Sequence, residues 1–163
     1  MRALATTAVS LGMLSASTLE LSAQRGLSRF NGVWRQVEIR VVRPDSTLMR
    51  PPAQGESIIL NGHFAQVYVG PAQPGMQQAS RLTTAEEKAA RYDLLTASAG
   101  TFEVHDSTVI QHFEYAKSPT MANTTSTFVY RLVGDSLWAT TTSPWAKDSS
   151  KVVRTTSKFV RQR

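Results

Sequence analysis

Short stretches in which apolar and polar residues alternate fill most of the chain after residue 30. The longest covers residues 33–42, and alternation over such a length predicts a half-buried β-strand. Strict alternation would turn Trp34 inward together with three polar residues, Gln36, Glu38 and Arg40. Either the interior is partly polar at this level, or a bulge after Trp34 resets the two faces of the strand.

Turn signals divide the rest of the alternating pattern into three hairpins and a last strand. Asn61-Gly62 is the strongest of these signals and predicts a hairpin of residues 56–60 and 63–69. Asp106-Ser107 and Gly134-Asp135 mark the other two turns. The strands that they separate are residues 101–105 with 108–115, and 124–133 with 136–142; the last strand is residues 151–163.

One segment has the composition of a helix rather than a strand. Residues 85–97 are good helix formers, Thr83 or Thr84 can cap the segment, and Glu86 and Glu87 stand in its first turn. The proline-bearing segments 43–55 and 70–80 are predicted loops. The prediction is therefore a mainly β fold: an eight-stranded antiparallel barrel with one helix inserted between strands three and four. Eight strands enclose an interior wide enough for side chains or one small ligand.

The N-terminus has the pattern of an export signal. A short basic start, Met1-Arg2, precedes the uncharged segment 3–17, and Leu21-Ser22-Ala23 is an acceptable cleavage site. We expect a signal peptide at residues 1–23, a single domain at 24–163, and a location in a bacterial periplasm or outside the cell. The alternative is a helical N-terminus of a protein that stays in the cytoplasm. No apolar run reaches the ~20 residues that span a bilayer.

Composition excludes several kinds of chemistry. The chain has no cysteine, so disulfides, zinc–thiolate sites and catalytic thiols are excluded. Its net charge is +6. The basic residues gather near the C-terminus, which fits a nucleic-acid surface or a solvated strand face, and the second interpretation suits an exported protein. They are Lys147, Lys151, Arg154, Lys158, Arg161 and Arg163.

Several segments come in an order that resembles the bacterial lipocalin-like domain family, which is largely without assigned function. They are Gly32-Val33-Trp34-Arg35, residues 82–90, Tyr92, residues 99–104 and 109–114, Pro119, and residues 132–137. The resemblance covers residues 31–163 and implies a cup-shaped barrel. It also implies that Gly32 lets the chain bend, that Trp34 plugs one end, and that an arginine of the last strand stacks on Trp34. Arg163 matches that arginine best, and Arg161 is the alternative.

The chain departs from the family pattern at positions that can shape a pocket. Gln111 stands where a second histidine is usual, and Met121 where a tryptophan is usual. A basic residue expected near Phe128 or Val129 is missing. If these positions line the pocket in relatives, the pocket of this chain is different and more apolar.

The candidate chemistry centres on one histidine. His112 and Glu114 are two residues apart on a strand and share a face, and Glu103 lies nearly opposite on the neighbouring strand. A histidine beside carboxylates suits a general base, a ligand-orienting group or an inert polar plug. Three tyrosines can offer a hydroxyl to a ligand or pack in the core: Tyr68, Tyr92 and Tyr130.

No other reactive pattern is present. His63 and His105 lie near turns and do not converge with His112, so we expect no metal site. No serine has a nucleophile-elbow sequence, and no glycine-rich phosphate loop exists.

These observations predict an exported, monomeric barrel that binds a small hydrophobic or amphipathic molecule, with no cofactor, no nucleic-acid partner and no stable membrane insertion. Its ligand would be oriented by His112, Glu114 and Glu103. Two alternatives stay open: an isomerase or cyclase that uses His112 as general base, and a structural barrel filled by its own side chains.

Overall fold

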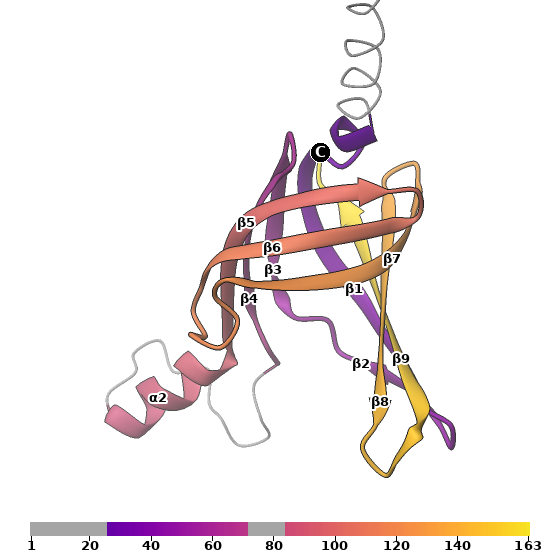
Figure 1. Ribbon diagram of the computed structural model, residues 1–163. Helices are drawn as coiled ribbons and strands as arrows, with labels where there is room; N and C mark the ends of the chain where they lie inside the picture. The colour runs from indigo at the N-terminus through magenta and orange to yellow at the C-terminus, as the bar shows by residue number, and fades with distance from the viewer. Residues whose placement is uncertain (1–25, 72–83) are drawn as a thin grey trace, which may run out of the picture.

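A computed structural model describes residues 26–71 and 84–163 (Figure 1). The predicted signal peptide, nearly all of the 70–80 loop and Thr83 lie outside the described residues. After a short helical turn at residues 26–28, nine strands and the helix α2 follow one another in the described chain. They are β1 (Gly32–Val42), β2 (Thr47–Arg50), β3 (Gln54–Leu60), β4 (His63–Val69), α2 (Ala85–Leu94), β5 (Leu95–His105), β6 (Thr108–Ala116), β7 (Thr124–Val133), β8 (Ser136–Trp145) and β9 (Asp148–Arg161).

The strands form one antiparallel sheet that closes on itself. Its order is β2-β1-β3-β4-β5-β6-β7-β8-β9, and β9 pairs back with β1. Eight strands therefore close the barrel, as predicted, while β2 pairs only with the far end of β1.

The predicted position of the helix was wrong by one strand. Helix α2 lies between β4 and β5 rather than between strands three and four. The reason is β2, which lies in the proline-bearing segment that was predicted to be a loop. The helix also ends at Leu94, and Leu95 already begins β5, so the last three residues of the predicted helix are strand.

A bulge in β1 settles which of its side chains face inward. Gln36 pairs with Phe159 and Glu38 with Lys158, so Val37 has no partner on β9. The extra residue shifts the alternation, which was one of the two predicted possibilities. Trp34 and Gln36 face the interior on one side of the bulge, and the buried Val41 does so on the other.

The helix begins at a capping box. Thr84 Oγ1 accepts from the backbone N–H of Glu87 at 3.1 Å, and Glu87 Oε2 accepts from the backbone N–H of Thr84 at 3.0 Å. These bonds satisfy two amide donors that a helix start leaves without partners. The cap fixes where the chain enters α2 and thereby where Tyr92 lies.

Apolar side chains fill one end of the barrel. The buried cluster consists of Phe30, Trp34, Phe64, Phe102, Val109, Phe113 and Leu137. Its rings meet edge to face, with centroids 5.5 Å apart for Phe30–Phe102 and for Phe64–Phe113. This geometry is favoured by the ring quadrupoles. The end at which β1 starts and β9 finishes is therefore closed.

Candidate ligand-binding site in the barrel

Arg161 and Trp34 close the filled end together. Trp34 is fully buried, and its indole Nε1 donates to the Phe30 carbonyl oxygen at 2.7 Å. The Arg161 guanidinium carbon lies 4.5 Å from the centroid of the Trp34 ring, which is a cation–π contact. The predicted stacking is thus made by Arg161. Arg163, the better match by sequence, is 92% exposed, so that assignment was wrong.

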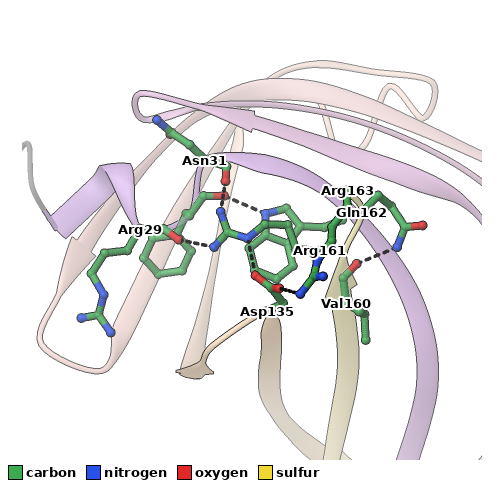
Figure 2. A network of polar contacts seen from close by, with 9 residues as sticks. Arg29, Asn31, Asp135, Val160, Arg161, Gln162 and Arg163 are labelled. Atoms are coloured by element: carbon green, nitrogen blue, oxygen red, sulfur yellow. Dashed lines mark hydrogen bonds and ion pairs between the residues drawn. The ribbon is translucent and has the colours of Figure 1, made fainter.

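Arg161 also ties the N-terminal segment to the barrel (Figure 2). Its Nη2 donates to the Arg29 carbonyl oxygen at 2.8 Å and its Nη1 donates to that of Asn31. Its Nε lies 3.4 Å from Asp135 Oδ1. Gly32 leaves room for this side chain, because a Cβ there would lie 3.2 Å from Arg161 Cγ and the glycine has a φ of +140°.

Replacing Arg161 with Met should lower the free energy of unfolding by about 3 kcal/mol. The change removes the cation–π contact and leaves two carbonyl groups without their charged donor. Urea unfolding followed by far-UV circular dichroism measures the loss. Arg163→Met is the matched control and should cost less than about 0.5 kcal/mol, because that side chain is exposed. Equal losses in the two variants would contradict the assigned role of Arg161.

A cavity of about 180 Å³ lies next to the buried apolar cluster that fills the closed end of the barrel. One part of its wall is apolar and includes Trp34, Ile59, Phe128, Leu137 and Phe159. The other part carries hydroxyl and amide groups, from Ser57, Gln66, Gln111, Ser126, Thr141, Thr155 and Ser157. No charged side chain of the described residues lines the cavity. The site therefore suits hydrogen bonding without charge.

Some of the polar lining is already occupied by bonds within the protein. The Tyr68 and Ser57 hydroxyl groups are 2.7 Å apart, Ser57 Oγ donates to Gln66 Oε1 at 3.3 Å, and Gln66 Nε2 donates to Ser98 Oγ at 2.8 Å. Burial raises the pKa of the Tyr68 hydroxyl above its ordinary value. Tyr68 therefore stays protonated and can donate. The polar groups of this network are therefore already hydrogen-bonded within the protein.

The remaining polar groups surround a gap in the barrel wall. The ladder between β7 and β8 ends at the pair Val129–Thr140, and Figure 1 shows β7 turning away to run beside β6 while β8 continues with β9. We call the stretch where residues 124–128 and 141–145 are not paired with each other the β7–β8 gap. Gln111 pairs with Ser126 on one side of it, and Thr141 pairs with Thr155 on the other.

Four side chains at the β7–β8 gap make no hydrogen bond within the part of the chain that the structure describes. They are Gln111, Ser126, Thr141 and Thr155. Their polar atoms remain accessible, since Arg161 Nε is the one buried side-chain nitrogen or oxygen among residues 26–71 and 84–163 that has no hydrogen-bond partner. Polar groups that converge on a cavity without partners are the kind of group that a ligand satisfies.

His112 and Glu103 lie on the outer face of the barrel. His112 pairs with Thr101 and Thr125, while its chain neighbours Gln111 and Phe113 face the interior. The two side chains do meet, with His112 Nε2 3.6 Å from Glu103 Oε1. Their predicted place inside the barrel was wrong, because the inward residues of β6 are the odd-numbered ones up to Phe113.

Glu103 has a second histidine partner that the sequence did not suggest. His105 Nε2 lies 3.0 Å from Glu103 Oε2. This hydrogen bond is the largest influence on the Glu103 carboxyl. Together with the nearby His112 it lowers the pKa of that carboxyl below its ordinary value, against a smaller opposing effect of desolvation. Glu114 stands at a second bulge, where Tyr115 pairs with Ala99 and Phe113 with Gly100, and it is exposed.

Comparison with known proteins decides the family. Residues 31–160 match the family model described as the lipocalin-like domain. The chain belongs to this family. No curated protein and no solved structure matches the chain.

The lipocalin-like barrel separates the three tyrosines predicted to meet a ligand. Tyr68 belongs to the polar network behind Ser57. Tyr130 packs in the closed end, with its ring centroid 4.9 Å from that of Phe30. Tyr92 stands on α2, outside the barrel, with Lys117 Nζ 4.0 Å from its ring centroid. Only Tyr68 is close to the cavity, and its ligand-binding role stays a prediction.

Two further features are absent from the described part of this lipocalin-like protein. Within residues 26–71 and 84–163, no group of three or more His, Asp or Glu side chains is arranged to hold a metal ion, Glu103 and its two histidines included. No helix among the same residues is long and apolar enough to cross a membrane.

Proposed function

We propose that this lipocalin-like protein binds a small, uncharged, amphipathic molecule in the barrel cavity at the β7–β8 gap. The observation that carries the proposal is a set of four side chains that converge there and have no hydrogen-bond partner among the described residues: Gln111, Ser126, Thr141 and Thr155. The family supports ligand binding in general. The residues that line the cavity indicate which class of molecule it binds.

The wall of the cavity selects the class of ligand. Because no charged residue in the described part of the chain lines the cavity, a charged ligand would lose its hydration without a compensating partner there. Trp34, Phe128 and Phe159 offer apolar contact, so one side of the ligand is apolar. The volume of about 180 Å³ is below the 300–1,000 Å³ common for drug-sized ligands, which favours a molecule of few heavy atoms.

The β7–β8 gap supports a route into the cavity. The backbone edges of residues 124–128 and 141–145 are not joined by ladder hydrogen bonds, so a ligand can pass between them without breaking the sheet. The closed end offers no such route because the buried apolar cluster fills it.

The proposal includes a monomeric state and export, and export is supported by the sequence pattern of residues 1–23 alone. Catalysis by His112 has no geometric support in this site, since His112 lies on the outer face of β6 and does not line the cavity. A purely structural barrel is disfavoured by the polar cavity, because an interior filled by its own side chains would leave no such space.

Native mass spectrometry of protein purified from its own host tests the proposal. Wild-type protein should carry a small bound molecule. Ala139→Leu should lose it, because Ala139 lines the cavity and the larger side chain takes its space. Thr127→Leu is the matched control at an exposed outer position of β7 and should retain the molecule. Retention of the molecule in Ala139→Leu would place the ligand elsewhere and overturn the proposal.

A further inference from the structure

One outer face of the barrel is apolar where the wall of a soluble barrel is usually polar. On β3, β4 and β6 the exposed fractions are 55% for Ile58, 59% for Leu60, 53% for Val67 and 71% for Tyr115. Contiguous exposed apolar area of this kind commonly marks an interaction site.

Three of these residues, Ile58, Val67 and Tyr115, line a hollow of about 1060 Å³. Cross-strand pairing puts Ile58, Ala65, Ala99 and Tyr115 in one row across four strands, and Val67 and Ala97 in the next row. The three alanines form a low floor between the larger side chains. We call these six residues the outer groove. Its volume is at the upper end of the range for small-molecule sites and far exceeds that of the barrel cavity.

The two ends of the outer groove differ in charge. At the β1–β3 end, Arg35 Nη2 lies 3.2 Å from Glu56 Oε1, so the two charges compensate each other. At the β6 end, Lys117 Nζ donates to the Tyr92 carbonyl oxygen at 2.6 Å and lies over the Tyr92 ring. No carboxylate of the described residues is within ion-pair distance of Lys117. The groove therefore has an uncompensated cation at one end.

We propose that the outer groove binds an anionic amphiphile. Its alkyl chain would lie on the alanine floor between Ile58, Val67 and Tyr115, and its carboxylate-type head would meet Lys117. The floor crosses three strand spacings from β3 to β6, a span of about 14 Å that suits a chain of medium length. Tyr92 acts as a positioning residue, since its carbonyl and ring hold the ammonium group at the groove. The proposal does not depend on the barrel cavity.

Isothermal titration calorimetry with decanoate, below its micellar range, tests the proposal. Wild-type protein should bind decanoate. Ala65→Glu should weaken binding by more than about tenfold, because it places a carboxylate in the apolar floor, where the alkyl chain of bound decanoate would cover it, and because both molecules then carry a negative charge. Thr127→Glu adds the same charge at an exposed outer position of β7 and should change affinity by less than about twofold. Val67→Glu is the second groove variant, and circular dichroism checks the fold of each.

One further variant tests the contact of Lys117 with the head group, and another distinguishes binding in the outer groove from binding in the barrel cavity. Lys117→Gln should weaken decanoate binding about fivefold and leave 1-decanol binding unchanged. Ala139→Leu, which fills the barrel cavity, should leave decanoate binding unchanged. Loss of decanoate binding in Ala139→Leu with retention in Ala65→Glu would place the alkyl chain of decanoate in the barrel cavity and overturn the proposal. A dimer that Ala65→Glu dissociates, with no decanoate bound, would assign the groove to a second copy and also overturn it.

Discussion

Replacing Trp34 with Ala should lower the free energy of unfolding by about 4 kcal/mol, the largest loss expected from a single side-chain truncation in this chain. Trp34 is fully buried at the centre of the closed end, donates to the Phe30 carbonyl, and supports the Arg161 guanidinium. Its removal leaves a cavity that the surrounding rings cannot fill, and Arg161 loses its stacking partner. Domains of this size are stable by only about 5–15 kcal/mol, so the variant should be marginally stable.

The matched control for Trp34→Ala is Trp145→Ala. Trp145 ends β8 and its ring has lysine neighbours, with Lys147 Nζ 5.4 Å and Lys151 Nζ 5.9 Å from its centroid. Because it is half-buried at the hairpin, its loss should cost about 1 kcal/mol. Urea unfolding followed by far-UV circular dichroism measures both variants. A Trp34→Ala loss no greater than that of Trp145→Ala would contradict the role of Trp34 as the plug of the barrel.

Replacing Gly100 with Ala should cost about 3 kcal/mol or more, although it adds only a methyl group. Gly100 lies on β5 opposite the β6 bulge at Glu114, and a Cβ there would be 1.9 Å from the His112 carbonyl oxygen and 3.0 Å from the Glu114 amide nitrogen. Both neighbours are backbone atoms, so the β5–β6 ladder must open to accept the methyl group. Urea unfolding measures the loss, and amide hydrogen exchange should show reduced protection in β5 and β6.

Gly134→Ala separates this steric effect from backbone strain. Gly134 has a φ of +55°, and a Cβ there would meet nothing within 4 Å. The cost should be about 1 kcal/mol, that of a left-handed conformation for a residue with a side chain. If Gly100→Ala cost no more than Gly134→Ala, the bulge would not be as tightly packed as the structure shows.

The hairpins could be predicted because local turn chemistry determines them. Asn61 and Gly62 both have positive φ, as do Asp106 and Gly134 in the other two predicted turns. The strands on either side then pair in the register that the turn imposes, as Leu60 does with His63. Local sequence was sufficient for these elements. In contrast, β2 could not be predicted, because Pro44, Pro51 and Pro52 around it favour a loop and only its pairing with β1 makes it a strand.

The candidate site was harder to predict because alternation does not identify the inner face. The bulges at Val37 and beside Gly100 each insert one residue, and an extra residue exchanges inward and outward positions along the rest of a strand. His112 was predicted on the wrong face for a different reason. Strand β6 alternates without a bulge from Val109 to Phe113 and carries apolar residues on both faces there, so alternation alone does not show that Val109 and Phe113 are the buried ones. Gln111 was noted as a departure from the family pattern, yet its meaning depends on Ser126, Thr141 and Thr155 across the gap. Those three residues carry no signal of their own in sequence.

The most direct test of the barrel site is a high-resolution crystal structure of protein purified from its own host without added ligand. We expect continuous non-protein density in the barrel cavity, within hydrogen-bond distance of Gln111, Ser126, Thr141 or Thr155. A cavity that holds only ordered water, in crystals of protein that carries a bound molecule elsewhere, would contradict the account.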